Sequence, residues 1–443
     1  MRIVFQKLYV YFVVNVILRI GEIIFGVRLS KNVKLYSDLL KKSESEILDY
    51  QTSQLLKILR NASEKSPFYK SIQIADGANV QDVIKDFPIM DKSTLKREYL
   101  SILTTSSTKL IKNSTSGSSG IQTEVFVTKE EQSKYRACQV IWWEWAGFEI
   151  GKPILQTGLS PRRTFEKLLK DFFFRTYYLF AFGLTTENVK RAFSWSRAKS
   201  PVLGGYASSL YVLSQIAEKE NLKVAFKSVI SWGDKMFDHY RANIERVFKC
   251  KVYETYGASE GLMMAAQKDL AFMYIMLPCV YIEILDEEGN EVPDGQIGNV
   301  VVTSLIHEAM PLIRYRLGDL AIKLPKTEYP DFREINLPLL QKVIGRETDI
   351  VKTKSGKKLI VHSFTGVFEY YPSIKQFCVV QRDLGGVEIQ YIRDDNFKVE
   401  VIESINLRLR ELVREDFEFR FVEVDFIQPT KSGKPQIIIS ELK

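Results

Sequence analysis

Four short runs in this sequence combine residue types that could do chemistry at a fixed spacing. They are residues 114–120, 256–260, 314–319 and 429–434. The first run offers hydroxyl side chains and glycine backbone, which can form an anion-binding concavity. The second and third end in a carboxylate that could bind a metal ion or a vicinal diol. The fourth ends in a lysine that could stabilise developing charge. Together these groups suit the activation of a carboxylate by ATP.

The run 114–120 is the candidate phosphate-binding loop. Its glycines would let the backbone approach phosphates, and no Gly-Lys-Ser/Thr follows at the spacing of a Walker loop. A plain surface turn would have a similar composition. Short apolar runs at 110–111 and 125–127 enclose the loop and predict a hairpin-like setting. The residues assigned to phosphate are Thr115, Ser116, Gly117, Ser118, Ser119 and Gly120.

The run 256–260 follows a short apolar strand at 252–253 and ends in Glu260. ATP presents adjacent phosphates whose charge must be neutralised as pyrophosphate leaves, and Mg²⁺ held by oxygen ligands does this. Glu260 is therefore the candidate metal ligand. The alternative is a strand that enters a helix, with Ser259 as the helix cap.

The run 314–319 reads Arg-Tyr-Arg-Leu-Gly-Asp and is the most specific of the four. Its Asp319 offers two acceptor oxygens, which suit the two hydroxyls of a ribose. The alternative is a charged turn with an internal Arg–Asp ion pair. The preceding residues 308–313, Glu-Ala-Met-Pro-Leu-Ile, make that alternative less convincing because they extend the pattern.

Taken in order, the four runs resemble the motifs of the acyl-adenylate-forming (AMP-binding) superfamily, which includes acyl-CoA ligases, peptide-synthetase adenylation domains and luciferase. Residues 308–319 are similar to the phenylacetate–CoA ligase family, especially its members associated with capsule and exopolysaccharide assembly. The resemblance covers residues 113–434. It implies that residues 115–120 bind the phosphates of ATP, that Glu260 binds Mg²⁺, and that Asp319 binds both ribose hydroxyls.

The same resemblance implies further site residues. Arg346 would contact the nucleotide. Lys434 would bridge the attacking carboxylate and the α-phosphate, and would be withdrawn when a small domain rotates. The residues assigned to the adenine and acyl pockets are Gly233, Asp234, Tyr256, Gly257, Ala258 and Ser259.

The chain departs from the family's motifs at three places. Ile121 and Gln122 stand where the superfamily commonly has Lys-Pro, so a cation that would help to hold the leaving pyrophosphate is absent there. Metal and hydroxyl contacts would then carry more of that charge. Leu317 replaces the usual threonine, and Thr348 occupies a hinge position that is usually charged.

The resemblance implies an AMP-forming acid ligase that works in two steps. A carboxylic acid and ATP would give an acyl-adenylate and pyrophosphate, and an acceptor would then displace AMP. Coenzyme A is the first candidate acceptor. An amine on a sugar or amino acid, in capsule or exopolysaccharide biosynthesis, is the alternative. A non-catalytic adenylate-binding protein is a second alternative.

The rest of the sequence predicts the elements that hold these groups. Apolar spacing predicts that residues 30–100 are mostly helical, including 38–60. Helical stretches then alternate with short apolar runs, and after residue 345 short strands surround an amphipathic helix at 399–414. The predicted fold class is a large multi-layer α/β domain followed by a small α+β domain. The predicted boundaries are an ATP- and acid-binding domain over 1–344, a hinge over 345–349 and a mobile domain over 350–443.

Composition limits the other classes of function. Hydrophobic residues at 45% and charged residues at 26% are ordinary for a globular protein. A net charge of +8 suits anionic ligands or an anionic membrane face, but no nucleic-acid-binding signature appears. The four cysteines lie far apart, so we expect free thiols in a reducing cytosol rather than a zinc site. Aromatic residues at 142–145, 172–174 and 195 could line an acyl pocket, although core packing is the preferred interpretation.

Residues 1–30 form an apolar segment that is predicted to be helical. Lys7, Asn15, Arg19 and Glu22 interrupt the roughly 20 apolar residues that a membrane-spanning helix needs. Two arrangements remain open, a helix packed on the large domain and an interfacial helix on the inner leaflet. Both predict a cytoplasmic enzyme, and the second adds peripheral membrane contact.

Overall fold

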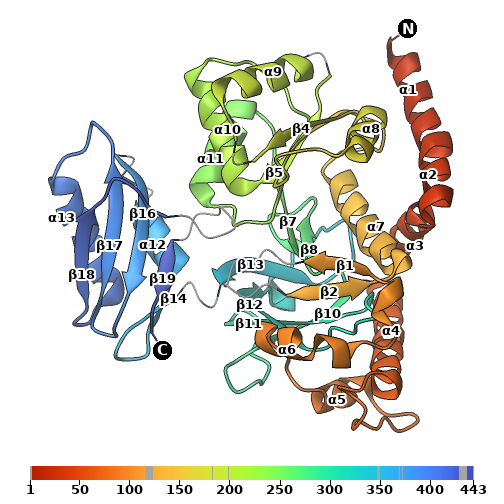
Figure 1. Ribbon diagram of the computed structural model, residues 1–443. Helices are drawn as coiled ribbons and strands as arrows, with labels where there is room; N and C mark the ends of the chain where they lie inside the picture. Colours follow the sequence, from red (N-terminus) through yellow and green to blue (C-terminus); the bar gives the residue numbers. More distant parts are fainter. Residues whose placement is uncertain are drawn as a thin grey trace.

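The protein consists of a large α/β part that ends at Arg346 and a smaller α+β part that begins at Ile350 (Figure 1). In Figure 1 the smaller part, in blue, stands beside the large part. This architecture confirms the predicted fold class. The structure is a computed structural model that describes residues 2–114, 123–181, 183–197, 199–346, 350–368, 370–371, 373–428 and 437–442.

The helices and strands alternate through the middle of the chain. The helices are α1 (Arg2–Phe12), α2 (Leu18–Phe25), α3 (Leu29–Leu39), α4 (Glu44–Lys65), α5 (Val80–Val83), α6 (Lys92–Ile102), α7 (Lys129–Trp145), α8 (Phe165–Phe173), α9 (Thr186–Ser196), α10 (Ala207–Lys219), α11 (Asp238–Phe248), α12 (Val361–Phe368) and α13 (Glu400–Val413). The strands of the large part are β1 (Ile111–Ser114), β2 (Glu124–Val127), β3 (Ile154–Gly158), β4 (Thr176–Phe180), β5 (Val202–Tyr206), β6 (Val229–Trp232), β7 (Val252–Ala258), β8 (Leu262–Gln267), β9 (Met273–Ile275), β10 (Val280–Leu285), β11 (Ile297–Ser304), β12 (Tyr315–Lys323) and β13 (Leu339–Arg346). Those of the smaller part are β14 (Ile350–Lys352), β15 (Lys358–Ile360), β16 (Ile374–Gln381), β17 (Gly386–Arg393), β18 (Glu418–Glu423) and β19 (Ile438–Ser440).

One sheet of 11 strands runs through the large part in the order β10-β11-β12-β13-β9-β8-β7-β6-β5-β3-β4. Strands β4, β3, β5, β6 and β7 pair in parallel. Helices α8 to α11 supply the crossovers that parallel strands need. From β7 to β10 the pairs are antiparallel. The change of direction therefore falls on β7, the strand that carries Tyr256.

Helices cover both faces of the parallel half of the sheet. Neighbouring residues on one strand point to opposite faces, so Leu155 and Leu203 pack with α9, α10 and α11. Ile154 and Val202 pack instead with Phe148, which follows α7. Burial on both faces is characteristic of a parallel sheet, and it explains the predicted α/β pattern.

The N-terminal region is mostly helical, as predicted, but residues 38–60 are not one helix. Helix α3 ends at Leu39 and α4 begins at Glu44. Ser43 caps α4, because its hydroxyl accepts from the backbone N–H of Glu46 and the Glu46 carboxylate accepts from the backbone N–H of Ser43. This capping box is visible in the sequence as Ser-x-x-Glu, and it divides the predicted helix.

Helices α1 and α2 form one long rod through the π-helical segment Val13–Ile17 (Figure 1). The rod touches the large part along one side, where Val13 is fully buried and the Tyr9 hydroxyl donates to the carbonyl of Phe173 at 3.0 Å. Only 6% of its most apolar stretch is buried, so the rod rests on the large part along one side and leaves most of its apolar side chains exposed. By length and composition the segment Phe5–Phe25 could cross a membrane.

The smaller part has its own sheet and its own core. Its sheet has the order β18-β17-β16-β19, and α12 and α13 contribute to a core that includes Phe364, Leu409 and Phe417. The predicted amphipathic helix at 399–414 corresponds to α13, and its buried residues are Ile405, Leu409 and Val413.

Candidate active site

Three strands of the large sheet bring predicted nucleotide-binding residues together. Asp319 on β12 lies opposite Arg346 in the antiparallel register of β12 and β13. The Tyr256 hydroxyl, from β7, donates to Asp319 Oδ2 at 2.9 Å, and Arg346 Nε lies 3.9 Å from Asp319 Oδ1. A carboxylate, a phenol and a guanidinium therefore meet at one point, although 63 residues separate Tyr256 from Asp319 in the chain.

Burial controls the charge of this carboxyl group. It raises the pKa of Asp319 above the ordinary aspartate value, whereas Arg346, Tyr256 and Lys92 lower it. Burial and the neighbouring Asp319 raise the pKa of Tyr256 well above its usual value, so this phenol stays a hydrogen-bond donor. Tyr256 thus holds Asp319 in one orientation and leaves acceptor capacity on its oxygens.

Glu260 lies in the turn that joins β7 to β8 and is 3% exposed. Its Oε1 accepts from the Tyr315 hydroxyl at 3.1 Å, and the Ser259 hydroxyl is 3.4 Å from Oε2. The turn depends on Gly261, whose φ of +90° is costly for other residues and where a Cβ would lie 3.0 Å from the Tyr135 ring and 3.2 Å from His307. The alternative that residue 259 caps a helix is wrong, since β7 continues through a turn into β8.

His307 stabilises this turn by a hydrogen bond to its backbone. Its Nε2 lies 3.0 Å from the Glu260 carbonyl, and its Nδ1 lies 2.6 Å from the Ser304 hydroxyl. Complete burial lowers the pKa of His307, so the ring is neutral. A carbonyl can only accept, so the proton sits on Nε2 and the Ser304 hydroxyl donates to Nδ1. Nothing in the local sequence singled out this histidine.

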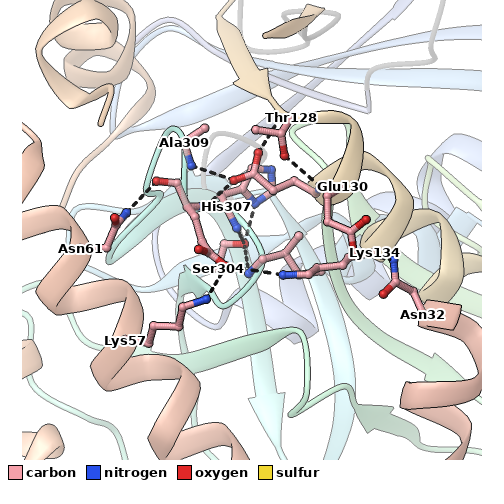
Figure 2. Close-up of polar contacts among 12 residues, drawn as sticks. Asn32, Lys57, Asn61, Thr128, Glu130, Lys134, Ser304, His307 and Ala309 are labelled. Carbon is pink, nitrogen blue, oxygen red and sulfur yellow. Dashed lines mark hydrogen bonds and ion pairs between the residues drawn. The ribbon is translucent and has the colours of Figure 1, made fainter. Parts of the chain in front are cut away.

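A buried carboxylate connects His307 with the hairpin β1–β2 (Figure 2). Glu131, on the first turn of α7, accepts from the backbone N–H groups of Thr128, Glu308 and Ala309. Figure 2 shows Ala309 and His307 beside Thr128, which directly follows β2. The residues that enclose the predicted phosphate loop and the turn that carries Glu260 are therefore tied to one another.

In the structure, Asp234 hydrogen-bonds to the start of a neighbouring helix. Its carboxylate accepts from the backbone N–H groups of Ala207 and Ser208 at 2.5 and 3.1 Å, and from the Ser208 hydroxyl at 2.5 Å. These are the first residues of α10, so Asp234 caps that helix from a neighbouring loop. Gly233 has a φ of +80°, and a Cβ there would lie 2.4 Å from the Tyr206 ring. Both residues shape the end of β6, and Asp234 directs its oxygens at the protein backbone.

Arg314 and Arg316 do not pair with Asp319. Arg314 makes a buried, two-point ion pair with Glu283, at 3.2 and 3.0 Å, and Arg316 pairs with Glu287 at 3.2 Å. The alternative of a turn with an internal Arg–Asp pair is therefore wrong. The two arginines instead pair with glutamates near β12, and the contacts of Asp319 are with Tyr256 and Arg346.

Lys92 is a candidate site residue that the sequence reasoning missed. It is the first residue of α6, next to the helix cap Asp91. Met90 pairs with Tyr315 and brings this helix start beside β12. Burial and Arg346 lower the pKa of Lys92, whereas Glu260 and Asp319 raise it, so its ammonium group lies within electrostatic range of the site. No local motif marks this lysine, because its position depends on the pairing of residue 90 with β12.

Several predicted residues lie outside the described residues. They are Thr115, Ser116, Gly117, Ser118, Ser119 and Gly120 of the phosphate loop, Thr348 of the hinge, and Lys434. The strands that enclose the loop form the predicted hairpin, with Ser114 opposite Glu124. Residues Gly257 and Ala258 continue β7 beyond Tyr256.

The donor set fits a nucleotide with Mg²⁺. No cluster of three or more His, Cys, Asp or Glu side chains that could hold a metal by itself occurs in the described part of the chain. Glu260 would therefore be a single protein ligand, a buried carboxylate that accepts from the Tyr315 and Ser259 hydroxyls. Phosphate oxygens usually complete such a Mg²⁺ site. Glu260, Tyr315 and Lys92 would face the phosphate end, and Asp319 the ribose.

The aromatic residues divide into two groups. Trp142 is buried in the main core, and Trp143 stacks on Trp232 at 5.5 Å, as the packing interpretation predicts. Phe172 is 72% exposed, so packing in the core is wrong for this residue. All four cysteines are free thiols, as expected.

Comparisons with known proteins show which chains this protein resembles. The family model described as AMP-binding enzyme matches residues 189–305, which include Glu260. Protein CapK of Staphylococcus aureus is 21% identical over 440 residues, which cover 96% of this chain and 95% of CapK. Phenylacetate-coenzyme A ligase of Escherichia coli strain K12 is 24% identical over 351 residues, which cover 70% of this chain and 73% of that protein.

Solved structures show the same fold. The structure of 2-hydroxyisobutyryl-CoA ligase in the postadenylation state, in complex with R3-HIB-AMP, superposes with a TM-score of 0.69 at 18% identity. The match covers 90% of this chain and 89% of that ligase. With the motif residues that the fold brings together, these matches support the resemblance to the AMP-binding superfamily of adenylate-forming ligases, in the branch of phenylacetate–coenzyme A ligase and CapK.

Proposed function

We propose that this protein activates a carboxylic acid with ATP and Mg²⁺ as an acyl-adenylate and then transfers the acyl group to coenzyme A. The observation that carries the proposal is the convergence of Tyr256, Asp319 and Arg346, from three strands, next to the buried Glu260. A nucleotide with ribose hydroxyls and phosphates uses all of them.

In the first step, a carboxylate oxygen of the acid attacks the α-phosphorus of ATP. The bond from that phosphorus to the bridging oxygen breaks, and pyrophosphate leaves with the electron pair. Asp319, oriented by Tyr256, would accept from the ribose hydroxyls, and Lys434 would stabilise the charge on the α-phosphate. Glu260 would hold Mg²⁺, which when bound supplies the positive charge that the departing pyrophosphate needs.

In the second step, the acceptor attacks the acyl carbonyl. The bond between the acyl carbon and the phosphate oxygen of AMP breaks, AMP leaves with the electron pair, and the acceptor loses its proton. We place the hinge at residues 345–349, which begin with the last two residues of β13, so that residues 350–443 would rotate and withdraw Lys434 between the steps. The residue just before this hinge is held to the large part, because the Lys235 ammonium group donates to the Ile344 carbonyl at 2.5 Å. This contact supports a rotation that begins after residue 344.

An amine acceptor is the alternative for the second step. The match to CapK extends over almost the whole chain, whereas the match to the Escherichia coli phenylacetate-coenzyme A ligase covers 70% of it. This favours a function shared with CapK over the activation of phenylacetate. An amide-forming ligase in capsule or exopolysaccharide biosynthesis would use the same first step and the same residues.

Acid-dependent release of pyrophosphate from ATP and Mg²⁺ tests the proposal. Aryl, fatty, hydroxy and amino acids would be compared, with and without coenzyme A, and Lys434→Ala would serve as the inactive control. We expect release that requires one class of acid and is lost in the variant. Formation of a thioester with coenzyme A would support the thiol acceptor, and an amide formed only with an added amine would favour the alternative.

A non-catalytic protein would behave differently in the same assay. It would bind ATP, as measured by calorimetry, yet release no pyrophosphate with any acid. Such a result would refute the proposed activity and support the second alternative, an adenylate-binding protein.

A further inference from the structure

Exposed apolar side chains are concentrated on two neighbouring helical elements. Of the 27 large apolar side chains exposed in the described residues, 13 belong to the rod α1–α2 or to α8. On α8 they form a stripe at helical spacing, and their exposed fractions lie between 48 and 79%. The stripe is Phe165, Leu168, Leu169 and Phe172. On the rod they are Phe5, Leu8, Tyr11, Phe12, Val16, Ile20, Ile23, Ile24 and Phe25.

The rod and α8 lie side by side. Figure 1 shows α8 next to α1, and two contacts join them. Tyr9 donates to the carbonyl of Phe173 at the end of α8, and the Arg175 guanidinium lies over the Tyr9 ring at 5.4 Å. Val10 and Val13 also pack against Gly151 of the large part. The two elements that carry the exposed apolar side chains are therefore neighbours on the surface of the molecule.

These two segments also carry most of the protein's net charge. Residues 2–31 and 159–175 contain ten lysines and arginines against three acidic residues, a net charge of +7, and the whole chain has +8. Two of the three acidic residues are held in ion pairs. Glu22 pairs with Arg19, and Asp171 binds Arg163 at 2.9 and 2.6 Å.

A cavity of about 340 Å³ opens beside α8, between the apolar stripe and two cations. The cavity is lined by Leu168, Phe172, Thr176 and Trp195, by the cations Arg175 and Lys199, and by Asp171, whose carboxylate pairs with Arg163. Lys199 lies over the Trp195 ring at 4.0 Å. Burial and the neighbouring Arg175 lower the pKa of Lys199, which reflects two like charges close together. An anion between them would relieve this repulsion.

We infer that the rod α1–α2 and α8 form one docking surface for an anionic lipid bilayer, with an acidic headgroup between Arg175 and Lys199. Apolar side chains would enter the acyl boundary and the basic residues would face anionic headgroups. A second copy of this chain fits less well, because two surfaces of +7 would repel one another. A rod that crossed the bilayer would lose its contacts with Phe173 and Arg175, so docking in the plane of the membrane retains more of the observed structure.

Flotation of the full-length protein with lipid vesicles tests this inference. Vesicles of phosphatidylcholine would be compared with vesicles that also contain phosphatidylglycerol. The protein should float with the anionic vesicles, and added salt should release it. The variant Phe165→Ser/Phe172→Ser keeps the rod intact and should lower vesicle binding by about tenfold or more, because binding scales with buried apolar area. Lys199→Gln should reduce the preference for phosphatidylglycerol.

A matched control is available in Phe332→Ser/Phe426→Ser, which replaces two side chains that are 76 and 71% exposed outside the proposed surface. This control should bind vesicles as the unmodified protein does, with thermal melts confirming that each variant is folded. The inference would be overturned if the unmodified protein failed to float, if the α8 variant floated equally well, or if the control lost binding to the same extent. Resistance to extraction by alkaline carbonate would indicate a spanning helix and would also contradict it.

Discussion

Two aspartates that the sequence assigns to the nucleotide occupy contrasting environments. Asp234 directs both carboxylate oxygens at the first residues of α10, where backbone N–H groups and a hydroxyl saturate them. Within the described residues, Asp319 is contacted by two side chains from other strands, the Tyr256 phenol and the Arg346 guanidinium. A carboxylate that satisfies the fold's own backbone contributes to stability. One that is held by side chains, with acceptor capacity remaining, is suited to a ligand.

The largest expected effect comes from breaking this contrast at Asp319. Asp319→Asn keeps the shape but turns one acceptor into a donor, which opposes the ribose hydroxyls. We expect kcat/KM for ATP in pyrophosphate release to fall by about 10²–10³, the loss typical when a buried polar partner is mismatched. Asp234→Asn is the matched control and should change the KM for ATP by less than about threefold. Equal losses of kcat/KM for ATP in the two variants would show that Asp319 and Asp234 do not differ in their role toward the nucleotide.

Glu260→Gln tests the metal role of the neighbouring carboxylate. The amide is isosteric but uncharged, so it binds Mg²⁺ weakly. The rate of pyrophosphate release should fall by roughly 10²-fold and the Mg²⁺ concentration for half-maximal rate should rise. A variant with normal Mg²⁺ dependence would remove Glu260 from the metal site.

His307 acts on the site through Glu260, so its effect should be smaller. His307→Ala removes the donor to the Glu260 carbonyl and should reduce metal affinity by about tenfold, as for other groups that orient a metal ligand. His307→Gln retains an N–H donor and should recover part of that loss. If both variants bound Mg²⁺ equally well, the hydrogen bond would have no positioning role.

Asp234→Ala should affect stability rather than chemistry. It leaves the first N–H groups of α10 without their acceptor, which costs about 0.5–2 kcal/mol for a helix cap. A denaturant titration should show this loss, while pyrophosphate release by the folded fraction stays close to normal. Loss of ATP binding at full stability would instead return Asp234 to the nucleotide site.

The sequence predicted those parts of the fold and site that depend on local patterns. The α/β alternation, the hairpin around the phosphate loop and the amphipathic helix now seen as α13 follow from apolar spacing. Only the family resemblance assigned both Tyr256 and Asp319 to the nucleotide. Their hydrogen bond joins two strands that are 63 residues apart in the chain, so no local pattern predicts it. The capping contacts of Asp234 could not be predicted, because its partners Ala207 and Ser208 lie 27 and 26 residues earlier.

Lys92 and His307 could not be predicted for a related reason. A lysine after a helix cap and a histidine in an apolar run have no chemistry of their own. Lys92 reaches the site because Met90 pairs with Tyr315, and His307 reaches it because its ring donates to the Glu260 carbonyl. Such positions depend on tertiary contacts between distant segments, which single-residue patterns do not contain.

The smallest expected effect is a shift in pH dependence at Asp319. Burial raises the pKa of Asp319, so its protonation should weaken ATP use at a pH above the ordinary aspartate range. Arg346 lowers that pKa because a nearby cation favours the carboxylate. Removing the cation in Arg346→Gln should therefore move the acid limb of kcat/KM for ATP upward, by roughly one pH unit.

The plateau of the Arg346→Gln profile will fall if Arg346 also touches the nucleotide, whereas the shift in the midpoint of the limb, relative to the unmodified protein, reports the change at the carboxyl group. Arg316→Gln is the matched control, because Arg316 is on the same strand as Asp319 and pairs with Glu287. Its limb should stay in place. An unmoved limb in Arg346→Gln would mean that this arginine does not govern the charge of Asp319, and the side-chain environment that distinguishes Asp319 from Asp234 would then rest on Tyr256.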